Sequence, residues 1–178
     1  MVSSITLKNL IIGYRSKHQL RAIASPVHAS LQAGELTCLI GANGVGKSTL
    51  LRTLAGFQPA LDGDILIQDK SLSDFSAQEL AREISIVLTS KTDHAQLSAE
   101  EIVGIGRSPY TGFWGTLSAA DKQIVASALQ KTGIQHLAQR NISELSDGER
   151  QKVMIAKALA QQTRIIILDE PTAFLDFP

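Results

Sequence analysis

Residues 41–49, Gly-Ala-Asn-Gly-Val-Gly-Lys-Ser-Thr, form the most specific chemical pattern in this sequence. They fit the pattern Gly-x-x-x-x-Gly-Lys-[Ser/Thr], in which glycines let backbone N–H groups wrap closely around phosphate oxygens. We expect Lys47 to reach the β- and γ-phosphates of a nucleotide, Ser48 to ligate Mg²⁺ and Thr49 to contact an inner phosphate. The other nucleotide contacts expected in this loop are Gly41, Asn43, Gly44 and Gly46.

The flanks of this loop indicate the elements that would position it. Residues 36–40 form a short apolar run with strand character, residues 50–55 have helical character, and Gly56 stands where a helix C-cap belongs. A loop that leads from a strand into a helix presents unpaired N–H donors and the positive end of the helix dipole to an anion. These flanks favour a phosphate loop over the alternative, a glycine-rich turn with a surface lysine.

A second chemical pattern follows residues 164–168, a nearly continuous apolar run that ends in Asp169 and Glu170. Two carboxylates at the carboxyl end of a buried strand lie where open α/β sheets bind ligands. In a protein with a phosphate loop, such an aspartate holds Mg²⁺ and the following glutamate can orient and deprotonate the attacking water. We expect Asp169 and Glu170 to take these two roles; the alternative is a solvated strand end.

A third pattern, residues 145–151, precedes a clear helical repeat. Ser146 followed three residues later by Glu149 is a capping box, which needs no further function. The start of this helix is alternatively a second anion site for the same nucleotide. The two interpretations are compatible.

Composition narrows the possible functions. The 178 residues suit about one domain, and 17 basic against 17 acidic side chains create no overall field toward nucleic acid. The single cysteine, Cys38, lies in the predicted strand before the loop, so we expect it to pack as a small apolar residue in a reducing cytosol. The four histidines have no metal-ligand spacing, and no apolar run reaches the length of a membrane span, so another subunit would provide any membrane association.

The remaining elements are predicted from periodicity and turn residues. Strands at residues 4–14 and 23–31 would form a small antiparallel sheet, and the order strand, helix, strand at residues 64–68, 73–82 and 84–88 implies that these two strands pair in parallel. The aromatic residues of 109–114 belong either to a packed loop or to an exposed surface for a partner protein. Further predicted elements are a strand at 64–68, a helix at 73–82 capped by Asp74, and a helical lobe with helices at 100–106 and 119–132, the second stopped by Gly133.

The order of these motifs resembles the ATP-binding subunit of ABC transporters. The phosphate loop is followed by a helical insertion ending in Leu-Ser-x-Gly-Glu, then by Ile-Leu-Asp-Glu-Pro-Thr, and the likeness runs from about Ser4 to the last residue. The resemblance implies an α/β P-loop fold with a mainly parallel core sheet, an antiparallel β subdomain and a helical subdomain. Residues 1–178 would form a single domain, with 1–88 and 155–178 as the ATP-binding core and 89–154 as the helical subdomain.

The resemblance also implies roles for particular residues, with ATP and Mg²⁺ as cofactors. Two such domains close head to tail on two ATP molecules, so that the signature residues of one subunit reach the γ-phosphate held by the other. Here the signature residues would be Ser146, Gly148 and Glu149. Tyr14 would stack on adenine, Thr89 and Asp176 would couple the subunits, and Glu170 and Lys47 would be catalytic.

Within the family, three short segments look most like importers of iron-siderophore, haem or cobalamin complexes: residues 106–110, 114–115 and 118–121. The implied function is ATP hydrolysis that powers an importer. Its partners would be a second ATP-binding subunit in a homodimer, an integral-membrane permease and a substrate-binding protein, without nucleic acid. The subunit would lie in the cytoplasm against the inner membrane face. Alternatives are a soluble non-transport ABC ATPase and a nucleotide-binding module without useful turnover.

Three departures from the family pattern are visible. Thr89 stands where the family usually has a glutamine that contacts Mg²⁺, and Asp147 stands where the signature usually has glycine. The chain also ends at Pro178, before the remaining strands and the switch histidine of the family. From this we expect a fragment or truncated product with impaired hydrolysis.

Overall fold

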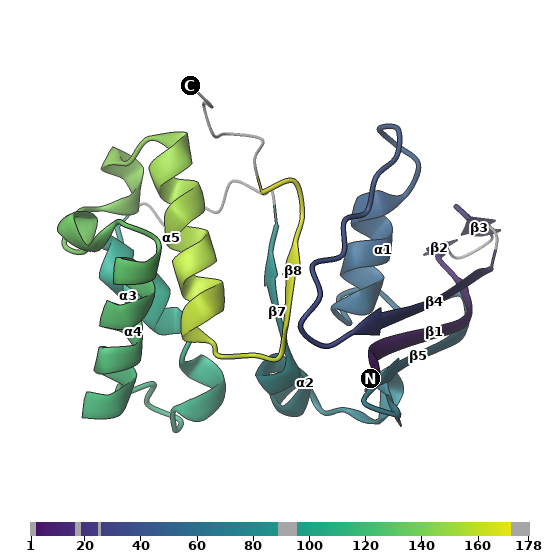
Figure 1. Cartoon of the computed structure of the whole chain (residues 1–178), viewed down its shortest axis with the longest axis horizontal. Coiled ribbons are helices and arrows are strands. Elements are labelled where there is room, and N and C mark those ends of the chain that lie inside the picture. The colour runs from purple at the N-terminus through teal and green to yellow at the C-terminus, as the bar shows by residue number, and fades with distance from the viewer. Residues whose placement is uncertain (1–2, 17–18, 25, 89–95, 172–178) are drawn as a thin grey trace. The chain divides into compact units, whose positions relative to one another are not determined.

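The computed structural model describes residues 3–16, 19–24, 26–88 and 96–171 (Figure 1). The chain forms two compact units, Met1–Leu80 and Ala81–Pro178. The first unit contains an antiparallel sheet and the helix that follows the phosphate loop. The second contains a cluster of helices and a parallel pair of strands.

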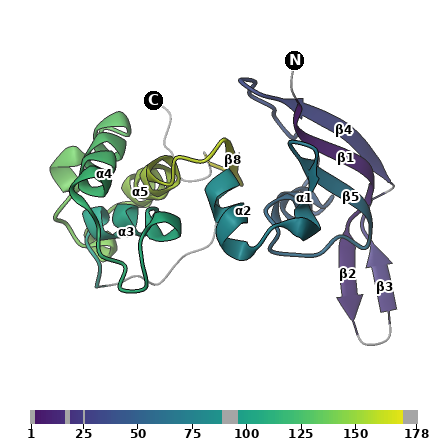
Figure 2. The same ribbon diagram turned by 90° about the horizontal axis from the view of Figure 1, so that it is seen from below.

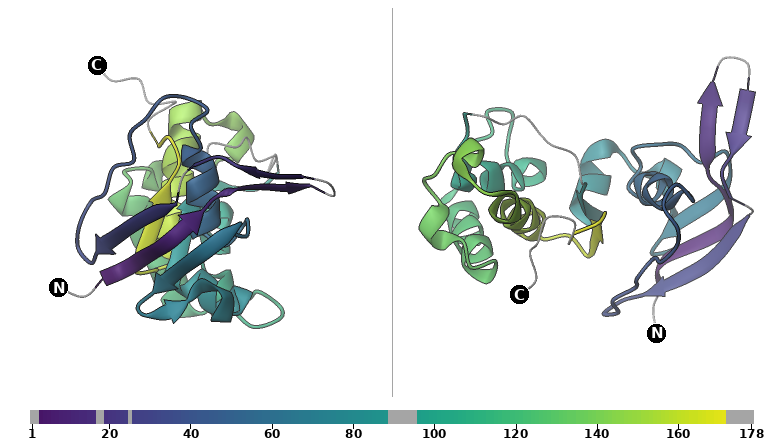
Figure 3. Two further views of the ribbon diagram at one scale, coloured as in Figure 1. Left: turned by 90° about the vertical axis from the view of Figure 1, so that its right-hand side faces the viewer. Right: turned by 90° about the horizontal axis from the view of Figure 1, so that it is seen from above.

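The sheet of the first unit is built around β1 (Ser3–Ile11), which pairs antiparallel with β4 (Val27–Gln32) and β5 (Asp62–Ile67). These strands lie side by side in Figures 1 and 3, and the short β6 (Lys70–Ser71) completes the order β4-β1-β5-β6. Ile5 and Leu7 are buried while Lys8 is exposed, as expected of a strand with one face on a core. The predicted antiparallel sheet is confirmed.

A hairpin of β2 (Gly13–Ser16) and β3 (Gln19–Ala22) extends away from this sheet, as Figure 2 shows. Gly13 begins it at a point where the two chains approach closely. A Cβ atom at Gly13 would lie 2.1 Å from the carbonyl oxygen of Arg21, so only glycine fits. Strand β3 was not predicted, because it has only four residues and all four are exposed, so no buried apolar face marks it in the sequence.

Helix α1 (Lys47–Leu54) begins directly after the phosphate loop, and Gly56, at a φ of 75°, follows its end as predicted.

The predicted strand at residues 36–40 is wrong. The run belongs to no strand of the described sheets, and Leu36 and Ile40 are each 90% exposed. Apolar composition gives a segment strand propensity, but a strand persists only where a neighbour pairs with its backbone. Cys38 is exposed, so its predicted burial is wrong for the same reason.

The second unit begins in α2 (Ala77–Glu83) and continues into β7 (Ile84–Val87), which pairs in parallel with β8 (Ile165–Leu168). The predicted strand at 84–88 is confirmed, but its predicted parallel pairing with residues 64–68 is wrong, because β5 pairs antiparallel with β1 and the partner of β7 is a strand distant in the sequence. Helix α2 starts later than predicted, because Asp74 belongs to a separate 3-10 turn, η1 (Leu72–Asp74). The bonds at the start of α2 are made by Ser76 and Glu79, each of which accepts a backbone N–H from the other.

Helices α3 (Ala99–Ile105), α4 (Ala119–Lys131) and α5 (Asp147–Ala160) pack around a shared core that includes Val103, Leu129 and Val153. This confirms the predicted helices, and Gly133 follows α4 with a φ of 71°. Each of the three helices starts with a capping box. Within the described residues, no helix is long and apolar enough to span a membrane. The connecting 3-10 turns are η2 (Ser108–Tyr110), η3 (Gln135–Leu137) and η4 (Ile142–Glu144).

Candidate functional site

The phosphate loop has the backbone conformation that its glycines allow. Gly44 and Gly46 adopt φ angles of 78° and 106°, in the left-handed region that side chains disfavour. A Cβ atom at Gly46 would also lie 2.5 Å from Cγ2 of Ile23. Gly46 is the N-cap of α1, so the loop leads straight into the end of a helix where backbone donors and the helix dipole favour an anion.

Lys47, the first residue of α1, folds back over this loop. Its Nζ donates hydrogen bonds to the carbonyl oxygens of Gly41 at 2.8 Å and Ala42 at 2.9 Å. Two neutral carbonyls thus hold the ammonium group at the loop. A phosphate oxygen is a stronger, charged acceptor, so it can take over these protons without a large movement of the lysine.

Tyr14 and Thr49 are brought together from β2 and α1. The Tyr14 hydroxyl lies 3.1 Å from Oγ1 of Thr49, and Thr49 is buried while the tyrosine is 53% exposed. About half of the tyrosine is therefore open to solvent, and its hydroxyl contacts the residue expected at an inner phosphate. Sequence patterns suggested both residues separately but not their contact, which depends on how the hairpin folds.

Asp169 and Glu170 follow β8 at its carboxyl end, as predicted. The Asp169 N–H donates to the carbonyl oxygen of Val87 at 2.9 Å, which extends the pairing with β7 by one residue. The Asp169 side chain is buried, whereas Glu170 is exposed and has a φ of 49°, an uncommon conformation outside glycine. The other residues predicted for coupling, Thr89 and Asp176, lie outside the described residues.

The signature residues lie at the start of α5. Ser146 is the N-cap; its Oγ accepts the N–H of Glu149 and donates to Oε2 of Glu149 at 2.8 Å, which confirms the capping box. The backbone N–H of Ser146 and then its hydroxyl lower the pKa of the Glu149 carboxyl. Asp147 faces Arg150 at 3.4 Å, so its carboxylate has a cation beside it. Gly148 occupies the first turn between these groups.

The oxygen donors of Ser48 and Asp169 suit a Mg²⁺ ion that arrives with a nucleotide better than a metal ion held by the protein alone. In the part of the chain that the structure describes, no cluster of three His, Cys, Asp or Glu side chains could hold a metal. Mg²⁺ usually takes one or two protein oxygens and completes its shell with phosphate oxygens and water. The Ser48 hydroxyl and the Asp169 carboxylate are oxygen donors of the kind it takes. The two residues belong to different units, so the structure describes the surroundings of each separately.

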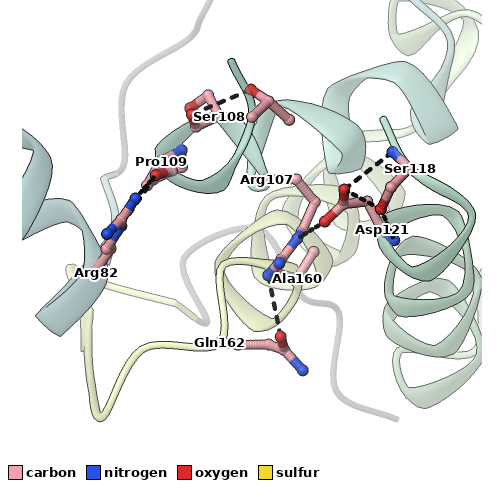
Figure 4. A network of polar contacts seen from close by, with 9 residues as sticks. Arg82, Arg107, Ser108, Pro109, Ser118, Asp121, Ala160 and Gln162 are labelled. Atoms are coloured by element: carbon pink, nitrogen blue, oxygen red, sulfur yellow. Dashed lines mark hydrogen bonds and ion pairs between the residues drawn. The ribbon is translucent and has the colours of Figure 1, made fainter. Parts of the chain in front are cut away.

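Sequence patterns missed one buried polar network in the second unit. Arg107, only 6% exposed, donates to Asp121, to the carbonyl oxygen of Ala160 and to the side chain of Gln162 (Figure 4). The pattern Ser-x-x-Asp at residues 118–121 could have predicted the capping box that holds Asp121. No local pattern predicts the burial of Arg107, since its partners lie far away in the sequence.

Comparison with known proteins agrees with the geometry. The ABC transporter family matches residues 24–173. An ABC transporter ATP-binding protein of Haemophilus influenzae is 44% identical over 96% of this chain and 63% of the relative. The iron(3+)-hydroxamate import ATP-binding protein of Bacillus subtilis is 36% identical over 98% of this chain and 64% of the relative.

The fold is shared with solved ATP-binding cassettes. A dimeric cassette in a post-hydrolysis state with ADP and phosphate matches with a TM-score of 0.83 at 26% identity, covering 97% of this chain and 76% of that one. The chain spans less than two thirds of the length of the two curated relatives. With the family match over most of its length, this α/β chain belongs to the ABC transporter family.

Proposed function

We propose that this chain binds ATP and hydrolyses it to power an ABC importer. The phosphate loop carries this proposal: two glycines in left-handed conformations lead into α1, and Lys47 is held at the loop by two carbonyl groups. A helix N-terminus beside an ammonium group is suited to the β- and γ-phosphates of a nucleotide. The exposed ring of Tyr14, in the same unit, supports adenine as the base.

Hydrolysis would use the strand-end carboxylates. Glu170 is exposed after the carboxyl end of β8, so water can reach its carboxylate, which can act as a general base. Asp169 and Ser48 would hold Mg²⁺, which neutralises charge on the transferred phosphoryl group when it is bound. Ser146, Gly148 and Glu149 would act in trans, from a second copy of the chain. Since the Ser146 hydroxyl already donates to Glu149, a γ-phosphate would have to displace that bond.

The transported substrate is proposed from the relatives. The Bacillus subtilis protein is an iron(3+)-hydroxamate import subunit, and an iron-siderophore, haem or cobalamin complex is the substrate class we propose here. The proposed partners are a second ATP-binding subunit, a membrane permease at the cytoplasmic face and a substrate-binding protein. Phe113 and Trp114, 96% and 87% exposed with their rings edge to face at 5.4 Å, support a permease-binding surface near residues 109–114, the aromatic segment.

Steady-state phosphate release in the presence of Mg-ATP tests the hydrolytic role. We expect the Glu170→Gln variant to bind ATP normally but to release phosphate at least about 100-fold more slowly, because a general base usually contributes a factor of this size. ATP binding without phosphate release, in the unchanged chain as well as in the variant, would instead support a nucleotide-binding module. Equal release by both proteins would remove Glu170 from the mechanism.

A further inference from the structure

Arg107 lies two residues after the end of α3 and is almost completely buried, although arginine is rarely buried without partners. Its Nε donates to Oδ1 of Asp121 at 2.8 Å, in the first turn of α4. Its Nη1 donates to the carbonyl oxygen of Ala160 at 2.9 Å and to Oε1 of Gln162 at 3.1 Å (Figure 4). One guanidinium group thus joins the end of α3, the start of α4 and the end of α5.

Arg107 contacts α5 at its carboxyl end, where backbone carbonyl groups lack partners within the helix. Ala160 is the last residue of α5, and the last carbonyl groups of a helix lack partners within the helix and carry the negative end of its dipole. The neighbouring Gly106 makes this approach possible, since a Cβ atom there would lie 2.4 Å from the carbonyl oxygen of Lys157. The arginine therefore satisfies and anchors the carboxyl end of α5.

The same guanidinium group also contacts the aromatic segment. Its central carbon lies 4.1 Å from the centre of the Tyr110 ring, a cation–π distance. Arg82 supports this turn from the other side, through two hydrogen bonds from its guanidinium to the carbonyl oxygen of Pro109. Tyr110 is therefore fixed against Arg107, while Phe113 and Trp114 remain exposed beyond it.

The other end of α5 carries the signature. The helix has 14 residues, about 21 Å at 1.5 Å per residue, and its buried side chains Val153, Ala156 and Ala160 fix it in the helical core. Ser146 caps its first turn. A shift at the anchored end of such a helix changes where its first turn points, because a packed helix moves as a unit.

We propose that Arg107 is a positioning residue that ties the aromatic segment to the carboxyl end of α5 and thereby orients Ser146 and Gly148 toward nucleotide held by a second copy of the chain. This inference rests on the proposed function. The added element is a specific link between the aromatic segment, proposed to bind the permease, and α5, proposed to reach the nucleotide.

Self-association in the presence of Mg²⁺ and a non-hydrolysable ATP analogue tests this link, measured by sedimentation beside analogue binding by calorimetry. Tyr110→Ala removes the stacked ring and leaves the ion pair, and Tyr110→Phe is its matched control. Arg107→Lys keeps a charge for Asp121, but a lysine cannot reproduce the forked contacts to α5 and the stacking on Tyr110 together.

We expect Tyr110→Ala and Arg107→Lys to weaken analogue-dependent self-association at least about tenfold, while analogue binding to the chain's own loop changes less than about twofold. Tyr110→Phe should behave as the unchanged chain. Normal self-association of both variants would overturn the proposal. Parallel loss of analogue binding and self-association in both variants would also overturn it, because it would show that Arg107 and Tyr110 support the fold as a whole and not the position of α5 in particular. A chain that binds the analogue without self-associating overturns the proposal but leaves the binding function intact. A chain that binds no analogue refutes both.

Discussion

At the scale of single residues, the contact between Tyr14 and Thr49 assigns two separable roles to one tyrosine. The exposed ring is suited to a base, and the hydroxyl, 3.1 Å from Thr49, holds the residue expected at an inner phosphate. Tyr14→Phe keeps the ring and removes only the hydroxyl. We expect the Kd for ATP to rise about two- to tenfold, the effect of one lost hydrogen bond, while the Kd for adenosine stays the same.

Tyr14→Ala is the comparison for this measurement, since it should weaken the binding of ATP and adenosine alike. Competition against a fluorescent nucleotide gives both constants. If Tyr14→Phe weakens adenosine binding as strongly as ATP binding, the hydroxyl acts on the base and not through Thr49.

A second prediction concerns Asp121 and pH. The Ser118 hydroxyl, and next the Arg107 guanidinium, lower the pKa of Asp121 from its ordinary value of 3.8 to about 2. A carboxyl with a lowered folded-state pKa stabilises the fold where it is ionised, above about pH 4, and this contribution is lost as the pH falls toward 2. We therefore expect Asp121→Asn to be less stable than the unchanged chain near neutral pH, by a margin that narrows below pH 4.

Urea unfolding of both proteins across this pH range checks the prediction. Among the described residues, the other carboxyls with lowered pKa values are Glu79, Glu101 and Glu149, which are present in both proteins, so their titration cancels in the difference. A margin that stays constant down to pH 2.5 would show that the ionised Asp121 does not stabilise the fold.

At the scale of elements, the close approach of α3 to α5 depends on Gly106. A Cβ atom at this position meets backbone, which cannot turn aside as a side chain can. We expect Gly106→Ala to lower the free energy of unfolding by about 1 to 3 kcal/mol, the usual cost of overpacking a core. Gly112→Ala is the matched control, because a Cβ atom there meets open space, and its stability should change by less than about 0.5 kcal/mol. Similar stabilities of the two variants would contradict the packing described here.

Elements with strong local signals were predictable from the sequence, and elements defined by distant partners were not. The helical repeat and Ser146 with Glu149 predicted the start of α5, since a capping box is a local contact. Residues 36–40 had the composition of a strand, but composition does not supply a pairing neighbour. At α2, the predicted cap was Asp74, but Ser76 accepts the N–H of Glu79 at the start of the helix.

The residues of the candidate site also fall into those that a local motif predicts and those that depend on distant partners. Its phosphate loop, strand-end carboxylates and signature were predicted because each is a short motif with fixed spacing. Arg107 was not predicted as part of a network, because its bonds to Asp121, Ala160 and Gln162 span 14 to 55 residues of sequence. A side chain whose role depends on such contacts leaves no periodic pattern.

At the scale of the whole molecule, the chain places its proposed chemistry in two units. The phosphate loop, Lys47 and Tyr14 belong to the first, and the carboxylates and the signature belong to the second. Net charge is balanced, so long-range attraction contributes little, and nucleotide binding depends on local groups. The central claim therefore depends most directly on the loop.

Calorimetric titration of the unchanged chain, Lys47→Ala and Lys122→Ala with Mg-ATP tests this claim. Lys122 is an exposed lysine on α4, away from the loop in the sequence, and serves as the control for loss of charge. We predict that Lys47→Ala weakens ATP binding about 10- to 100-fold, the worth of hydrogen bonds to a charged group, while Lys122→Ala binds as the unchanged chain does. Equal binding by all three proteins, or no binding by any, would contradict the account.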